Sequence, residues 1–119
     1  PNPFTTLDLS QNTQLTHFGC SKNKLTALDL SKNTALTSLD WSYNPHLLLD
    51  LSGFPNLTEL NYSGNGLTAL NLSNNRTLTE LDCSGNKLTA LDVTKAAALT
   101  ELNAAATNSQ LSICPTIAH

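Results

Sequence analysis

The sequence lacks the features that several broad protein classes require. Its 119 residues contain no methionine, only 5% aromatic and 13% charged residues, and a formal net charge of -3. Without a basic run there is no cationic surface for phosphates, so we expect no nucleic-acid partner. The longest apolar runs, such as 47–49 and 96–99, are far shorter than the roughly 20 residues of a membrane-spanning helix, so we expect no membrane insertion. No secretory leader is recognisable, and we interpret the chain, which starts at Pro1, as a mature protein or an excised fragment.

Cysteine and histidine are scarce, with three residues of each. The cysteines form no CxxC pair and no Cys/His cluster, which argues against a zinc site or another metal site. No histidine can be grouped with a serine or cysteine nucleophile and a carboxylate. We therefore predict that the chain is not an enzyme and has no cofactor.

The sequence is dominated instead by an internal repeat. The dipeptide Leu-Thr recurs every 21 residues, at Leu15, Leu36, Leu57, Leu78 and Leu99. The four units in 15–98 share the pattern LTxLDxSxNxLTxLDLSxNxx, residues 1–14 supply a partial N-terminal repeat, and 99–119 supply a degenerate terminal repeat. Within each unit the pattern nearly recurs after about ten residues, so each coil should consist of two similar half-turns.

This spacing suits a solenoid and does not suit a helix. Leucines at i, i+3 and i+5 form no single stripe on a helix, whereas on a short strand alternate residues point the same way. Coils stacked at the strand spacing of about 4.8 Å would bury their leucine columns in one core. A buried carboxamide can also bond to the backbone of inward turns. Asparagines suited to this role recur in two columns, Asn23, Asn44, Asn65 and Asn86, and Asn12, Asn33 and Asn75.

The segment LTELDCSGNKLTALDVT at 78–94 resembles the leucine-rich repeats, LxxLxLxxNxL, and in particular the 21-residue internalin J-type repeats of bacterial surface proteins. The resemblance covers roughly residues 4–108. It implies an α/β-class leucine-rich-repeat solenoid of short parallel β-strands with extended convex segments and little or no helix. It also implies a curved recognition domain with a column of cysteines. That column here reads Cys20, Trp41, Tyr62, Cys83 and Ala104, so a continuous cysteine ladder is interrupted.

Acidic residues also recur in columns, at positions that should point outward from the strands. Glu59, Glu80 and Glu101 share one position of the repeat, and Asp40 and Asp82 share another. A solvated face is the simplest interpretation; a bridging calcium ion and a basic patch on a partner are the alternatives. A further acidic column, in the second half-turn, contains Asp8, Asp29, Asp50 and Asp92. The predicted ligand-binding residues are His17, Asp40, Tyr43, Glu59, Asn61, Glu80, Asp82 and Glu101.

The unit 36–56 departs most from the repeat, because it carries aromatic residues where other units have small or polar ones. Trp41, like Tyr62 in the next unit, falls in an inward column, and we expect both to fill the core. Tyr43 falls in an exposed column, which makes it a candidate contact residue. Phe54 replaces an asparagine of the second column, so the backbone polar groups of the turn at this position must find other hydrogen-bond partners.

We predict a non-enzymatic binding module of a bacterial surface or secreted protein, which recognises a protein or glycan on a cell surface through its strand-lined face. The chain should be extracellular or at the bacterial cell surface, and a monomer or part of a longer chain. Two alternatives stay open, a structural spacer of a longer repeat protein and an ice-binding surface. The second of these depends on a column of threonines, Thr16, Thr37, Thr58, Thr79 and Thr100.

Overall fold

The computed structural model describes residues 6–20, 27–44, 49–104 and 112–114, and the statements that follow concern these residues. Short strands and one 3-10 turn alternate along the chain. They are β1 (Thr6–Leu7), β2 (His17–Gly19), β3 (Ala27–Leu28), β4 (Ser38–Asp40), η1 (Leu51–Gly53), β5 (Glu59–Asn61), β6 (Glu80–Asp82), β7 (Ala90–Asp92), β8 (Glu101–Asn103) and β9 (Ser112–Cys114). The predicted solenoid of short parallel strands with almost no helix is confirmed.

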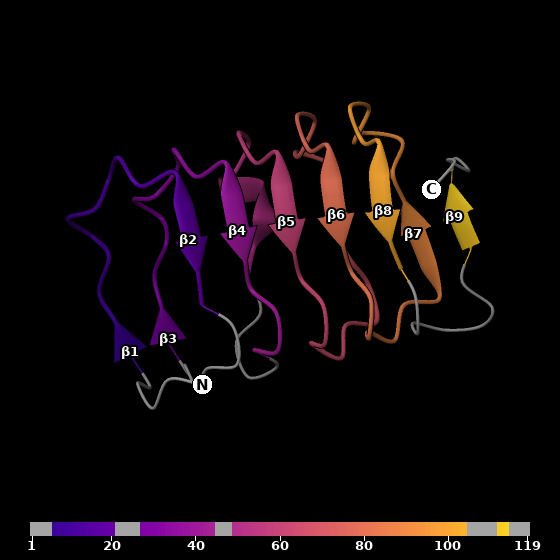
Figure 1. Cartoon of the computed structure of the whole chain (residues 1–119), viewed down its shortest axis with the longest axis horizontal. Coiled ribbons are helices and arrows are strands. Elements are labelled where there is room, and N and C mark those ends of the chain that lie inside the picture. The colour runs from indigo at the N-terminus through magenta and orange to yellow at the C-terminus, as the bar shows by residue number, and fades with distance from the viewer. Residues whose placement is uncertain (1–5, 21–26, 45–48, 105–111, 115–119) are drawn as a thin grey trace.

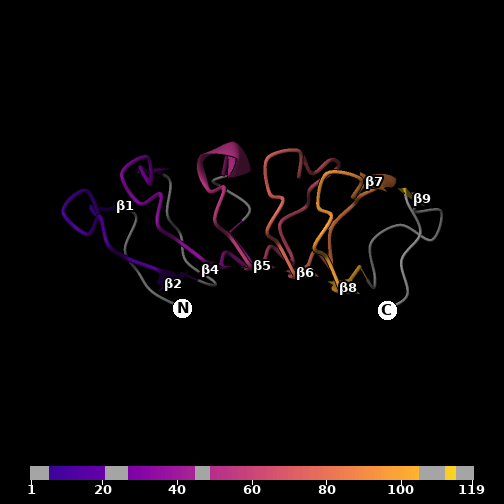
Figure 2. The same ribbon diagram turned by 90° about the horizontal axis from the view of Figure 1, so that it is seen from above.

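The first half-turns of the coils build a five-stranded parallel sheet in the order β2-β4-β5-β6-β8. Figure 1 shows these strands side by side in one row. Every pairing joins residues 21 apart, from His17 opposite Ser38 to Glu80 opposite Glu101. Seen from above, the strands line one side of the molecule, and β7 lies on the opposite side (Figure 2). The repeat period therefore sets the register of this sheet, here called the main sheet.

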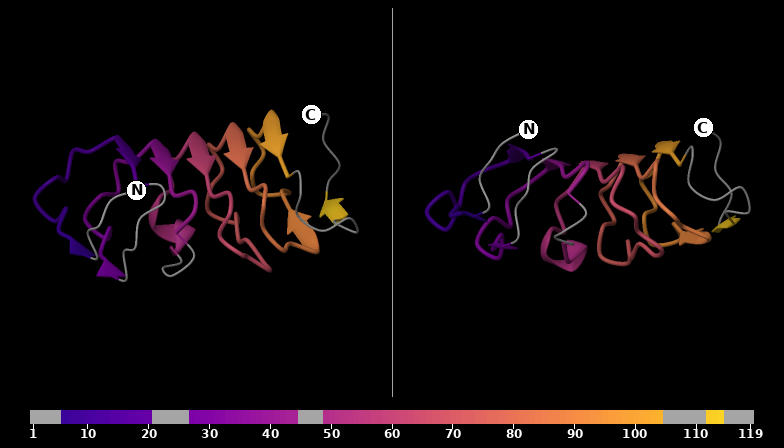
Figure 3. Two further views of the ribbon diagram at one scale, coloured as in Figure 1. Left: turned by 60° about the horizontal axis from the view of Figure 1, so that its bottom comes forward. Right: turned by 90° about the horizontal axis from the view of Figure 1, so that it is seen from below.

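The second half-turns pair less regularly. They form two separate two-stranded parallel sheets, β1 with β3 and β7 with β9, which lie toward opposite ends of the molecule with the coil of η1 between them (Figure 3). The β7–β9 register joins Ala90 to Ser112, which are 22 residues apart. The last coil thus contains one residue more than the repeat. The division into a partial repeat, four full repeats and a degenerate repeat stays a prediction.

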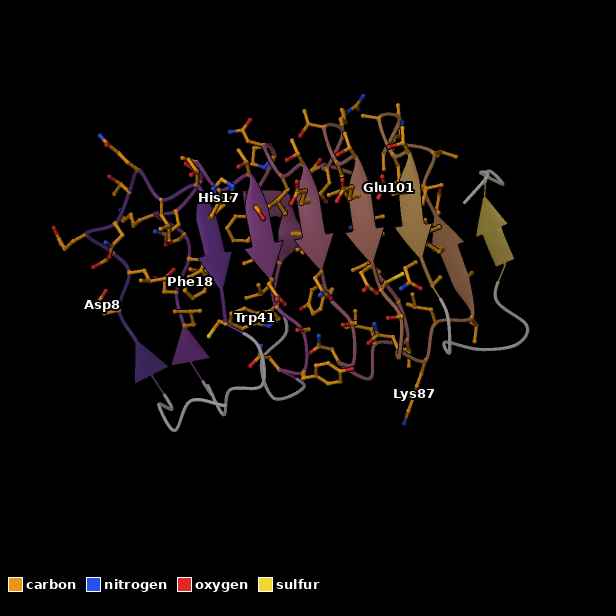
Figure 4. All side chains as sticks on the ribbon, in the orientation of Figure 1. Asp8, His17, Phe18, Trp41, Lys87 and Glu101 are labelled. Carbon is orange, nitrogen blue, oxygen red and sulfur yellow. The ribbon has the colours of Figure 1, made fainter. Side chains whose placement is uncertain are left out.

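Inward side chains of the coils form the core. Its largest members include Trp41 and Tyr62, which are fully buried as expected, and the rings of Phe18 and Trp41 lie 6.4 Å apart between centroids (Figure 4). The Tyr62 hydroxyl accepts a hydrogen bond from the Leu49 backbone N–H at 2.7 Å. Cys83 is buried in the same column, and burial raises the pKa of its thiol to about 11.

The first asparagine column joins one coil to the next, as predicted. Asn65 Nδ2 donates to the carbonyl of Trp41 in the preceding coil at 2.9 Å, and its Oδ1 accepts from the Asn44 N–H at 2.7 Å. Asn86 repeats the arrangement, because its Oδ1 accepts from the Asn65 N–H at 2.9 Å and its Nδ2 donates to the carbonyl of Tyr62 at 2.9 Å. Asn23 lies outside the described residues. These buried amides satisfy backbone groups that water cannot reach.

The turn at Phe54, which lacks the column's asparagine, is satisfied from the following coil. Asn75 Nδ2 donates to the carbonyls of Leu51 and Phe54 at 3.1 and 3.2 Å. The Asp50 side chain accepts from the Ser52 N–H at the start of η1. Asn33 makes the equivalent bonds to the carbonyls of Leu9 and Asn12, so Asn75 continues the second column. The buried Phe54 ring occupies the asparagine position, and the carbonyls of Leu30 and Asn33 in the preceding coil accept the N–H groups of Asn33 and Leu36 instead.

The threonine column forms another ladder. The hydroxyls of Thr37, Thr58, Thr79 and Thr100 each donate to the carbonyl of the threonine one coil earlier, at 3.0 to 3.3 Å. The same carbonyls accept backbone N–H groups from the next coil, such as Thr58 N–H to Thr37 O at 2.7 Å. These contacts give the threonines a structural role in stacking the coils.

Candidate functional site

A groove of about 550 Å³ crosses the outward face of the main sheet, over β4, β5, β6 and β8. It exists because side chains alternate along a strand, so the residues on either side of each buried leucine point outward. Six of the eight predicted site residues line the groove: Asp40, Glu59, Asn61, Glu80, Asp82 and Glu101. The structure thus brings most of the predicted set together on one surface.

The groove is acidic along its whole length. Its lining includes five carboxylates and no lysine or arginine. Glu59, Glu80 and Glu101 are exposed and lie directly opposite one another on adjacent strands. Repulsion from Glu101, and then from Glu59, raises the pKa of the Glu80 carboxyl. One basic side chain, Lys87, points away from the row of strands (Figure 4).

The two aspartates and Asn61 of the groove also have a structural role that the sequence reasoning missed. Asp40 Oδ1 accepts from the Ser42 N–H at 3.1 Å and from the Ser42 hydroxyl at 2.8 Å. Asp82 makes the same pair of bonds with Ser84, at 3.0 and 2.6 Å, and Asn61 makes them with the following serine. The signal was present in the sequence as the pattern D/N-x-S, which begins at the last residue of β4, β5 and β6 and is typical of Asx turns.

The second acidic column, on the other side of the coils, follows the same rule. Asp8, Asp29, Asp50 and Asp92 are exposed, and each accepts the N–H of the serine or threonine two residues later at 2.8 to 3.0 Å. These hydrogen bonds lower the pKa of the four carboxyls. Asn71 occupies the column once and makes the same bond, with the Ser73 N–H at 2.9 Å, so the position requires an oxygen acceptor and tolerates a neutral one.

His17 lies on the first strand of the main sheet but does not line the groove. Figure 4 shows His17 and Glu101 at opposite ends of the row of strands. The ring is exposed, and its Nδ1 shares a hydrogen bond with the Thr16 hydroxyl at 2.9 Å.

Across the described part of the chain, no three His, Cys, Asp or Glu side chains are grouped as a metal ion would require, and no helix is long and apolar enough to cross a membrane.

Tyr43 stands outside the groove, in the turn that follows β4. Its side chain is 51% exposed, and its backbone φ is 57°. The equivalent residues of the next two coils are Gly64 and Gly85, with φ of 69° and 67°. A left-handed conformation costs a non-glycine residue about 1–2 kcal/mol, so Tyr43 occupies a turn for which glycine is the favourable residue.

This chain is similar in structure to solved proteins. No protein-family model matches the sequence, and no curated protein is significantly similar to it. The functional domain of InlJ from Listeria monocytogenes, which includes a cysteine ladder, is 37% identical with a TM-score of 0.80 over 88% of this chain. A leucine-rich-repeat protein of Leptospira interrogans is 23% identical with a TM-score of 0.82 over 92%, a likeness of fold. The chain spans 23% and 30% of these two proteins respectively.

Proposed function

Because this chain is a bacterial leucine-rich-repeat solenoid of the internalin J-like type, we propose that it is a non-enzymatic binding module whose groove holds the basic surface of a partner protein. By this proposal the partner lies at a cell surface and the chain lies outside the cytoplasm, in keeping with the bacterial surface proteins that the repeat resembles. Repeat folds of this kind supply a scaffold, and the outward residues supply the specificity.

One observation carries the proposal, namely a groove with five carboxylates and no basic residue in its lining. Opposite charges across an interface speed association and select the partner. Charge repulsion from the glutamates on both sides raises the pKa of Glu80. A cationic side chain bound between these carboxylates would offset this repulsion. Salt should therefore weaken the complex, because exposed charges are screened within about 10 Å at 0.1 M.

The test compares two triple variants that lose the same charge from opposite sides of the solenoid. The groove variant is Glu59→Gln, Glu80→Gln and Asp82→Asn. The control variant is Asp29→Asn, Asp50→Asn and Asp92→Asn, which Asn71 shows to be compatible with the fold. Both are applied, with the original chain, to a panel of host-cell and bacterial-cell surfaces, with and without calcium.

We expect the groove variant to lose binding and the control variant to keep it. Equal loss in both would mean that net charge alone is responsible, which contradicts a role for the groove. Binding to none of the surfaces by folded protein would favour the structural spacer instead. Binding only in the presence of calcium would support the bridging ion considered from the sequence over a direct basic contact.

A further inference from the structure

Tyr43 is the one large apolar side chain exposed among the described residues. It stands where the next two coils have glycine, and its positive φ is unfavourable for any residue with a Cβ. Burial does not compensate for this, because half of the side chain faces solvent. Strained, exposed residues that the surrounding structure holds in place are typical of contact sites.

The Tyr43 ring lies against Gly64 of the next coil. A Cβ atom at Gly64 would overlap the Tyr43 ring atoms Cδ1 and Cε1, so the glycine leaves the room that the ring occupies. The backbone beneath it is fixed by two coil-to-coil bonds, Tyr43 N–H to Ser63 O and Gly64 N–H to Ser84 O, both 2.9 Å. The backbone on both sides of this contact is therefore fixed before a partner arrives, which lowers the entropy cost of binding.

The platform formed by Tyr43 and Gly64 lies in the turns that follow β4 and β5, two of the strands that line the acidic groove. Asp40, which lines the groove, is three residues before Tyr43 on the same coil. Both of its hydrogen bonds from Ser42 go to Oδ1, so Oδ2 remains available to a donor. A side chain that stacks on an aromatic face and donates to a carboxylate matches this pair of features. Arginine does both, because its guanidinium is planar, cationic and rich in N–H donors.

We propose that the platform of Tyr43 and Gly64 stacks an arginine side chain of the partner protein, whose guanidinium donates to Asp40. The inference rests on the proposed function, and it adds the residue type that the partner presents at this edge of the groove. A lysine at the same place would keep the charge but lose the planar stacking.

The experiment measures the affinity of the folded chain for nona-arginine and nona-lysine peptides at low salt by calorimetry. Stacking on an exposed ring corresponds to about a two- to fivefold gain in affinity. In Tyr43→Gly we expect the ratio of arginine to lysine affinity to fall by about that factor, while Tyr43→Phe keeps the ratio. An unchanged ratio in Tyr43→Gly overturns the proposal.

Two further measurements distinguish the arginine-stacking proposal from the proposed function on which it rests. The groove variant should bind both peptides more weakly, and a chain that binds neither peptide refutes the proposed function itself. The thermal midpoint of Tyr43→Gly should be unchanged or higher, because glycine suits the positive φ of this turn. A marked fall in the midpoint would show that the ring serves the fold, and would overturn the assignment to binding.

Discussion

Replacement of Asn65 by alanine tests how neighbouring coils are held together. Asn65 is only 4% exposed. Its Nδ2 donates to the carbonyls of Trp41, Tyr62 and Ser63, at 2.9, 3.2 and 3.0 Å. Its Oδ1 accepts from the Asn44 N–H at 2.7 Å. The substitution removes all four bonds. The carbonyls of Tyr62 and Ser63 keep other donors, Asn86 Nδ2 and the Tyr43 N–H, whereas the Trp41 carbonyl and the Asn44 N–H lose their buried bond to the next coil.

The expected cost follows from those groups. Each buried polar group that loses a hydrogen bond costs about 1–3 kcal/mol, and two groups lose one here, so we expect Asn65→Ala to lower the free energy of unfolding by about 2–6 kcal/mol. Asn75→Ala should cost less, about 1–3 kcal/mol. Asn75 donates two bonds through Nδ2, and its buried Oδ1 has no partner, so truncation also removes an unsatisfied atom.

Urea unfolding followed by tryptophan fluorescence measures these costs, because Trp41 is the one tryptophan and is fully buried. Asn74→Ala is the control, since this neighbouring asparagine is exposed, and its cost should stay within about 0.5 kcal/mol. A cost below about 1 kcal/mol for Asn65→Ala, or a cost equal to that of Asn75→Ala, would refute the ladder as the main coil-to-coil tie.

Three further outcomes are expected. Cys83 should resist iodoacetamide until the chain unfolds, because burial raises the pKa of its thiol to about 11; labelling at the unfolded rate would contradict this. Asp29→Asn, Asp50→Asn and Asp92→Asn together should flatten acid unfolding below pH 3.8, since a lowered pKa gives stability that is lost only as the pH falls through the folded value; an unchanged acid titration would exclude it. Thr58→Val should lower the free energy of unfolding in urea by about 0.5–1.5 kcal/mol, because the Thr58 hydroxyl donates at 3.1 Å to the preceding coil. An unchanged free energy of unfolding would show that the threonine hydroxyls do not stabilise the stacked coils.

The main sheet was predictable because a solenoid converts sequence period into spatial register. Stacked coils bring residue i beside residue i+21, so recurring residues such as Glu59 and Glu80 must face each other. The inward burial of Trp41 followed from the same rule. The second half-turns were less predictable. The 3-10 turn after Asp50 and the 22-residue register of β7 with β9 depend on local turn geometry that the repeat pattern does not contain.

The acidic column of the candidate site was predictable from the sequence, but the structural role of its aspartates was not. The sequence placed Asp40 and Asp82 with the glutamates as binding residues, and the structure shows that each also accepts two bonds from the serine that follows. His17 shares their face but lies outside the groove lining. Whether a carboxylate faces a partner or its own turn depends on the conformation after the strand, which one column position cannot reveal.

The sequence by itself determined the repeat, the parallel strands, the leucine and asparagine columns and the acidic face, because each depends only on which residues recur at a fixed interval. The tertiary structure alone decided how the side chains in the turns are used. The Tyr43 ring lies over Gly64, and it fits there because the next coil has no Cβ in the way. Such a fit depends on the shape of two neighbouring coils together, and a linear pattern records only the identity of each.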